Sequence, residues 1–127
     1  MRKVLALPFV ALSVTLAAPA AAAPPTTQVI VLPGAVSAEG VTAGGGSTFH
    51  AGDVFGGDIF RGDIRRGMAE RFIDAPSGAQ AIGMDVDLRH DLLFVAGGPV
   101  VAGPVTGGPG KAYVYETRTG APVATYD

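Results

Sequence analysis

Two histidines and a few scattered carboxylates are the residues of this chain that could hold a metal or move a proton. His50 and His90 are the only histidines, and the chain contains no cysteine. A copper/zinc superoxide dismutase needs a cluster of several histidine ligands, and catalytic zinc sites need three protein ligands such as His₃ or His₂Glu. Two isolated histidines supply neither set, so the sequence does not support superoxide dismutase chemistry.

Asp85, Asp87 and Asp91 are the densest group of carboxylates, and their spacing raises the question of a calcium loop. The glycine at the sixth loop position and the closing glutamate of an EF-hand are both missing. Residues 84–88 instead alternate strictly between apolar and acidic side chains, which is typical of a half-buried strand. We therefore expect a strand here, followed by a turn at residues 89–91.

Strands must position all of these side chains. Short segments rich in β-branched and aromatic residues alternate with Gly- and Pro-rich turns, and no apolar stripe of helical period follows the N-terminal segment. The expected strands are 28–32, 39–43, 48–52, 58–62, 69–73, 84–88, 92–95, 111–116 and 123–126. Aromatic side chains within them are expected in the core, namely Phe49, Phe60, Phe72, Phe94, Tyr113, Tyr115 and Tyr126. The sequence predicts an all-β chain.

A near-repeat organises these strands. The matches are Phe49-His50-Ala51-Gly52 with Phe94-Val95-Ala96-Gly97 at an offset of 45 residues, Glu39 with Ile82, and Gly67 with Gly120. Four-strand units that recur every ~40–50 residues are typical of β-propeller blades. The sequence therefore predicts two four-stranded antiparallel blades, at about 29–78 and 79–127, which form an incomplete ring.

Residues 1–23 have the pattern of a signal peptide. Arg2 and Lys3 precede an apolar stretch over 4–18 and a run of small residues. The stretch is short for a membrane span of ~20 residues and suits cleavage, with an uncleaved anchor as the alternative. The Ala-, Gly- and Pro-rich composition is typical of a GC-rich bacterial genome. We expect a secreted or extracytoplasmic bacterial protein with a flexible leader at 24–28 and no membrane contact after cleavage.

The charge pattern restricts the partners. A net charge of −2 provides no broad basic surface for phosphates, which argues against a nucleic-acid partner. The local basic group Arg61, Arg65, Arg66 and Arg71 is expected at a solvated sheet edge, where charge discourages edge pairing.

The order of an apolar strand, Glu-Gly, a Gly-rich turn, Phe-x-Ala-Gly and a charged hairpin resembles a known family. It is similar to the first two blades of the six-bladed propellers grouped as SMP-30, gluconolactonase and NHL-like proteins. Residues 37–41, 49–53 and 83–87 carry the likeness, which spans 29–127. Lactonases of that family bind one divalent metal, often calcium or zinc, and the resemblance assigns an early glutamate ligand to Glu39. The other ligands, an Asn and an Asp, come from later blades, and this chain has no Asn.

Two functions follow as expectations. The resemblance implies that the parent propeller is a metal-dependent lactone hydrolase acting on a small molecule, with this chain alone inactive because its metal site is incomplete. There the metal would polarise the lactone carbonyl and lower the pKa of a water. The alternative is a non-catalytic secreted propeller that serves as a binding or surface-interaction module. Repeat arrays need about three units for stability, so two blades also predict self-association to cover open blade edges.

Overall fold

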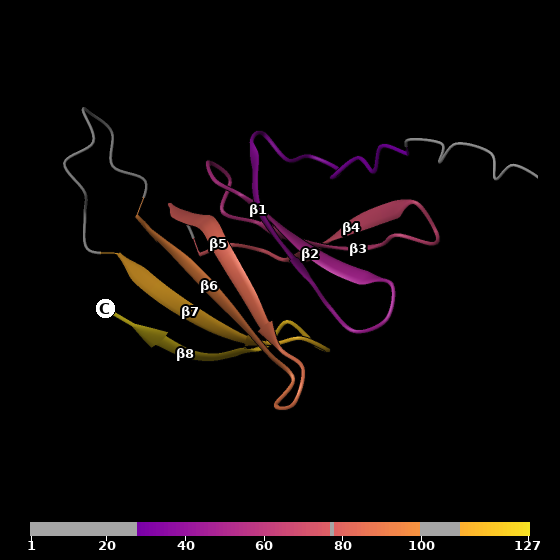
Figure 1. Cartoon of the computed structure of the whole chain (residues 1–127). Coiled ribbons are helices and arrows are strands. Elements are labelled where there is room, and N and C mark those ends of the chain that lie inside the picture. The colour runs from indigo at the N-terminus through magenta and orange to yellow at the C-terminus, as the bar shows by residue number, and fades with distance from the viewer. Residues whose placement is uncertain (1–27, 77, 100–109) are drawn as a thin grey trace, which may run out of the picture.

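The computed structural model of this chain describes residues 28–76, 78–99 and 110–127, so the predicted signal segment and nearly all of the leader lie outside it. The described residues form eight strands in two four-stranded sheets and contain no helix (Figure 1). The first sheet holds β1 (Ala38–Ala43), β2 (Thr48–Asp53), β3 (Ile59–Asp63) and β4 (Met68–Ile73). The second holds β5 (Ala79–Asp87), β6 (Leu92–Pro99), β7 (Lys111–Glu116) and β8 (Pro122–Tyr126). The all-β prediction is confirmed.

Each sheet is an antiparallel meander in which every strand pairs with the next strand along the chain. Short turns that contain glycine allow consecutive strands to pair in this way. The predicted strand at 111–116 is confirmed, while β5 and β6 extend beyond their predicted limits. β6 continues to Pro99, and residues 100–109 lie outside the described ones.

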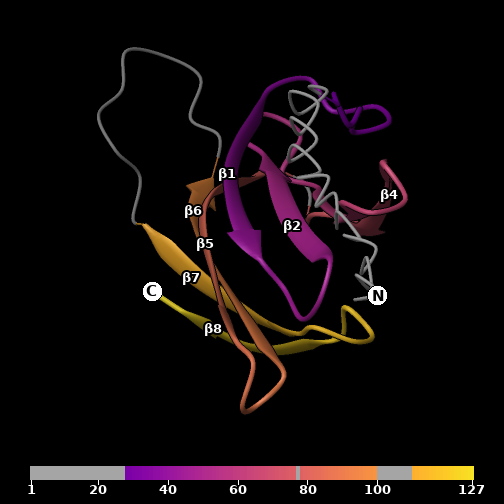
Figure 2. The ribbon, with the colours of Figure 1, turned by 45° about the vertical axis from the view of Figure 1, so that its right-hand side comes forward.

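The two sheets stack face to face and lie closest at their inner strands, where β1 and β2 lie against β5. Glycine permits this approach, because a Cβ on Gly40 would collide with the carbonyl of Ile82 and a Cβ on Gly52 would lie 2.7 Å from the carbonyl oxygen of Ala81. The turn after β1 lies beside the turn after β5, so these two strands run parallel (Figure 2). Farther out, a hollow of about 390 Å³ opens between β4 and the strands β7 and β8. The sheets therefore diverge from their inner to their outer strands.

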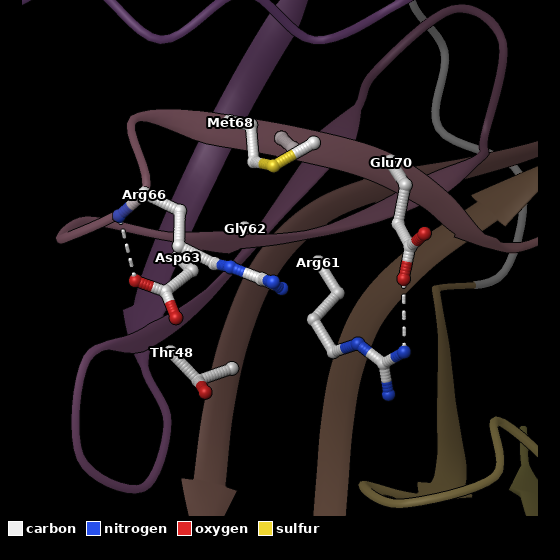
Figure 3. A pocket seen from close by; sticks show the side chains of 8 residues that line it. Thr48, Arg61, Gly62, Asp63, Arg66, Met68 and Glu70 are labelled. Carbon is white, nitrogen blue, oxygen red and sulfur yellow. Dashed lines mark hydrogen bonds and ion pairs between the residues drawn. The ribbon is translucent and has the colours of Figure 1, made fainter.

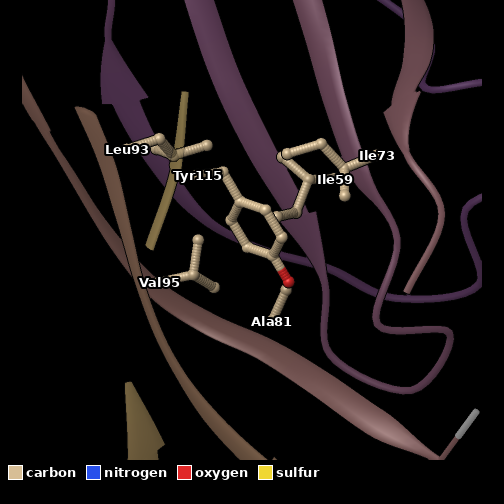
Figure 4. Close-up of a cluster of buried hydrophobic side chains, with 6 residues drawn as sticks. All are labelled: Ile59, Ile73, Ala81, Leu93, Val95 and Tyr115. Carbon is tan, nitrogen blue, oxygen red and sulfur yellow. The ribbon is translucent and has the colours of Figure 1, made fainter. Parts of the chain in front are cut away.

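An apolar cluster fills the space between the sheets (Figure 4). Strand alternation explains it, since every second residue of β6 and β7 points towards the first sheet. Met84 and Val86 of β5 pack against the same cluster, which confirms the alternation predicted for 84–88. The buried members are Ile59, Ile73, Ala81, Leu93, Val95 and Tyr115.

We call the face of the first sheet that contacts the second sheet its front face, and the opposite face its back face. Residues 28–37 cover part of the back face; Figure 1 shows this indigo segment running from the start of β1 towards β4. Gly34 lies beside the guanidinium of Arg71, and Phe60, which points to the back, is 0% exposed. The back face of the first sheet is therefore covered at Phe60 but open at Val41, which is 70% exposed.

The strand predicted at 28–32 is wrong, because these residues have no strand partner. The carboxylate of Asp53 instead anchors the end of the covering segment. It accepts hydrogen bonds from the backbone N–H groups of Val36 at 2.8 Å and Ser37 at 3.1 Å. A short apolar run cannot reveal from periodicity alone whether it will pair in a sheet or lie across one.

Hydrogen bonds of the hairpin turns show which residues of the two sheets correspond. In the first sheet the N–H of Ile64 donates to the carbonyl of Ser47, and in the second the N–H of Thr117 donates to the carbonyl of Asp91, both at 2.9 Å. Ser47 therefore corresponds to Asp91. The match of Gly67 with Gly120 is confirmed in the same way, because each N–H donates to a carbonyl four residues earlier at 2.9 Å.

The offset of 45 residues predicted between β2 and β6 is wrong by one residue. Counting from the matched turns, His50 rather than Phe49 corresponds to Phe94. Successive side chains of a strand point to opposite faces, so this shift changes the face. The ring of Phe49 lies against Gly62 on the back of the first sheet. Phe94 points away from the first sheet, on what we call the front face of the second sheet.

Candidate functional site

Glu39, the predicted metal ligand, lies exposed in β1, opposite Gly52. The strand register confirms its match with Ile82, because Thr42 and Asp85 pair with the corresponding residues of β2 and β6. Within residues 28–76, 78–99 and 110–127, no three His, Cys, Asp or Glu side chains gather into a group that could hold a metal. The other ligands implied by the resemblance belong to later blades, so a calcium or zinc role for Glu39 stays a prediction.

The side chain of Arg61, in β3, contacts both sheets. Its guanidinium lies 4.2 Å from the ring centroid of Phe72 and donates to the carboxylate of Glu70 at 3.0 Å. It also donates to the carbonyl of Arg118, in the turn between β7 and β8, at 3.3 Å. The prediction of a solvated edge is therefore wrong for Arg61, whose side chain reaches across the stack.

His50 is a buried titratable group between the sheets. Its side chain is 2% exposed, and its ring centroid lies 5.6 Å from that of Phe72. Neither ring nitrogen has a hydrogen-bond partner among the described residues. Burial, followed by the charge of Arg61, lowers the pKa of His50, so the ring is neutral near pH 7. A neutral imidazole offers one donor and one acceptor, and both are unused here.

Two adjoining hollows open beside Arg61 and Thr48. The first measures about 220 Å³ and lies along β2, β3 and β4 (Figure 3); its polar lining includes Thr48, Arg61, Asp63, Arg66 and Glu70. The second measures about 360 Å³, lies between the sheets, and is lined by Gly44, Gly45, Thr48, His50, Arg61, Val86, Leu88, Asp91 and Thr117.

Arg61, Asp63 and Glu70, which line the first hollow, already have hydrogen-bond partners. The carboxylate of Asp63 accepts from the backbone N–H groups of Arg65 at 2.8 Å and Arg66 at 3.0 Å, and so caps the turn after β3. The hydrogen bond from Arg66 is the largest cause of the lowered pKa of Asp63. Arg61 is paired to Glu70 in the same lining, while His50 of the second hollow keeps both ring nitrogens without a partner among the described residues.

The aspartates after β5 build a turn rather than a calcium loop. The carboxylate of Asp87 accepts from the N–H of Arg89 at 2.9 Å and lies 2.6 Å from Nδ1 of His90. This pairing is the main cause of the lowered pKa of Asp87 and the raised pKa of His90. Asp91 has a φ of 57°, so the turn predicted at 89–91 is confirmed.

The front face of the second sheet carries apolar side chains of unequal exposure, with Val114 at 3%, beside the carboxylates of Asp85, Asp87 and Glu116. Phe94 is 40% exposed and Tyr126 is 61% exposed, so their predicted core positions are wrong. Asp85 is the charged side chain that pairs with Phe94 across the strands. A shallow hollow of about 310 Å³ lies on this face around Phe94. The strand register places Ala96, Ala112, Val114 and Ala124 on the same face.

This exposed face is more apolar than the corresponding covered face. Phe94 stands where the first sheet has His50. Val114, which pairs with Phe94, stands where the first sheet has Arg61. The front face of the first sheet carries another sheet, so a position built for stacking is exposed in the second sheet. The sequence did not reveal this feature, because the predicted repeat was one residue out of register in these strands.

The cellular location and the protein family of this chain remain predictions. No helix within the described ranges is long and apolar enough to cross a membrane. None of the protein-family models, curated proteins or solved structures compared with the chain matches it.

Proposed function

We propose that this protein is an exported, propeller-type module that acts by binding another protein surface, rather than by catalysis. The observation that carries the proposal is the exposed front face of the second sheet. It corresponds in position to a face that already binds a four-stranded sheet. There Phe94, which is 40% exposed, and Val114, which is 3% exposed, replace His50 and Arg61. Exposed apolar patches of this kind mark interaction sites.

Three features support propeller-type stacking. The inner strands β1 and β5 run parallel, the sheets diverge towards their outer strands, and the same turn hydrogen bonds recur in both. A rotation about an axis beside β1 and β5 therefore relates the sheets, with the front of one against the back of the next. Successive blades of a propeller are related in this way.

The interaction role is tested with the dye ANS, which binds exposed apolar surface. We expect the folded protein to enhance ANS fluorescence, and Phe94→Lys to remove most of that signal. Val41→Lys is the matched control, because Val41 is 70% exposed but lies on the first sheet. Far-UV circular dichroism checks that each variant keeps its strands. Equal ANS signals from the wild type and Phe94→Lys would refute the assignment of this face.

The lactonase hypothesis predicts a different result. Titration with Ca²⁺ and Zn²⁺, and hydrolysis of simple γ- and δ-lactones, should then depend on Glu39. We expect neither metal affinity nor lactone turnover to change in Glu39→Gln. A metal-dependent turnover that is lost in Glu39→Gln would favour the enzyme over the binding module.

A further inference from the structure

We propose that the larger of the two hollows beside Arg61, the one between the sheets, is a binding site for a small uncharged polyol. This inference goes beyond the interaction face and does not depend on it. The hollow measures about 360 Å³, which is within the range of sites that hold small molecules. It lies at the end of the stack where the turns after β1, β5 and β7 come together (Figure 2).

Polar side chains from both sheets converge on this hollow. Thr48, His50 and Arg61 come from the first sheet, and Asp91 and Thr117 come from turns of the second. The remaining lining is apolar or glycine, which gives the carbon skeleton of a ligand an apolar surface. Convergent polar groups in an otherwise apolar hollow are typical of a small-molecule site.

The charges around the hollow favour an uncharged ligand. The guanidinium of Arg61 is already paired with the carboxylate of Glu70 at 3.0 Å, so an anion bound by Arg61 would lie close to a second negative charge. A cation attracted to Asp91 would share the hollow with Arg61. A charged ligand would therefore lose its water without gaining an unopposed partner. Hydroxyl groups avoid this cost, because they donate to Asp91 and accept from Arg61.

His50 supplies the observation that points to hydroxyl groups. It is 2% exposed, and neither ring nitrogen has a hydrogen-bond partner among the described residues. A neutral imidazole offers one donor and one acceptor, and a hydroxyl group can satisfy either. Arg61 pairs with His50 across the strands, and its side chain is 35% exposed. A ligand hydroxyl therefore reaches the buried imidazole by shifting this side chain, whose hydrogen bond to Arg118 is 3.3 Å long.

Nuclear magnetic resonance of the isotopically labelled exported protein, purified after secretion from a bacterial host, tests the site directly. The chain has 2 histidines, so the ring nitrogens give few signals, and His90→Gln assigns them. Titration with sorbitol or myo-inositol near neutral pH should shift the ring nitrogen signals of His50 and leave those of His90 unchanged. We expect the shift to saturate with a Kd of about 1–10 mM, as for a small polar ligand.

Two pairs of variants locate the binding. A Cβ on Gly45 would lie 3.9 Å from the side chain of Leu88, which is ordinary contact. Gly45→Leu should therefore fill the hollow and abolish the shift, while Gly45→Ala should retain it. Thr48→Val should weaken binding by at least about threefold, because one hydroxyl is lost. Thr125→Val is its control, because Thr125 is exposed on β8, outside both hollows.

The outcomes separate this proposal from its alternatives. The absence of any shift of the His50 signals up to about 100 mM polyol overturns it, as does a shift that Gly45→Leu leaves unchanged. Far-UV circular dichroism checks the folding of each variant, and equal affinities of Thr48→Val and Thr125→Val overturn the site even if Gly45→Leu does not fold. Sodium acetate and ammonium chloride are the charged probes. A shift with either salt and none with the polyols would overturn the choice of an uncharged ligand.

Discussion

Replacing His50 by phenylalanine tests the account of the space between the sheets. The second sheet already carries Phe94 at the corresponding position, so the backbone there accepts a phenylalanine side chain. His50 is 2% exposed and neither of its ring nitrogens has a partner among the described residues. We expect His50→Phe to raise the free energy of unfolding.

The magnitude follows from two opposing effects. A buried polar group without a hydrogen bond costs about 1–3 kcal/mol, and the substitution removes two such atoms. The larger phenylalanine ring adds volume to a packed interface, which costs about 1–3 kcal/mol where neighbours must shift. The net gain at pH 7.5 is on the order of 1 kcal/mol, with the wall of the adjoining hollow providing room for the shift.

The pH dependence gives the sharper test. Burial lowers the pKa of His50 below its ordinary value of 6.5, so as the pH falls the unfolded chain takes up a proton before the folded chain does. The wild type therefore keeps its full stability above pH 6.5 and loses up to about 1.4 kcal/mol per pH unit below it, until the folded pKa is reached. His50→Phe lacks this loss. Urea unfolding followed by far-UV circular dichroism at several pH values between 7.5 and 5.5 measures the difference.

His90 needs to be controlled in this experiment because it titrates in the same range with the opposite sign. Hydrogen bonding to Asp87 raises its pKa, so its contribution is present below its ordinary pKa and is lost as the pH rises. The His50→Phe variant and its parent are therefore compared in a His90→Gln background. A stability difference between these two proteins that is constant from pH 7.5 to 5.5 would refute a buried, neutral His50.

Four further substitutions, one of them a matched control, test the contacts that hold the sheets together. Asp53→Asn should lower the free energy of unfolding by about 2 kcal/mol and speed hydrogen exchange at Val36, because a charged acceptor of backbone N–H groups is lost; unchanged exchange would contradict the anchor. Gly40→Ala should cost at least about 2 kcal/mol in urea unfolding, since φ is 68° and Cβ would strike the carbonyl of Ile82. Its counterpart Gly83→Ala, on the open face, should stay within about 0.5 kcal/mol, and equal costs would refute the close approach. Arg61→Met should cost about 1 kcal/mol by the same measurement, and no loss would show that its contact across the sheets is dispensable.

Strand periodicity predicted most of the fold because the two faces of each strand differ. Residues 84–88 alternate between side chains that pack in the core and side chains that point away, and this pattern is plain in the sequence. Residues 28–32 have the same apolar character but lie across a sheet rather than within one. Their position depends on the distant carboxylate of Asp53, which no local pattern reveals.

The candidate site was less predictable because it depends on register. Phe94 was expected in the core because it is an aromatic residue within a strand, but the strand register places it on the face that points away from the first sheet, where it is 40% exposed. The side chain of Arg61 belongs to a run of charges typical of a solvated edge, and only the stacking of the sheets shows that it reaches Arg118. Glu39 was predicted to be a metal ligand from the family resemblance. The residues near it in the same strand offered no further ligands for a metal.

The meander topology also has a consequence for the order in which the protein folds. Every strand pairs with its immediate neighbour, and the anchor between Asp53 and Val36 closes within the first sheet. Such local contacts form quickly, because little loop entropy is lost before they are made. During synthesis the N-terminal part emerges first, so the first sheet can assemble before β5 is made. The second sheet can then pack against a first sheet that is already folded. The folding rate of the second sheet should therefore rise with the stability of the first sheet.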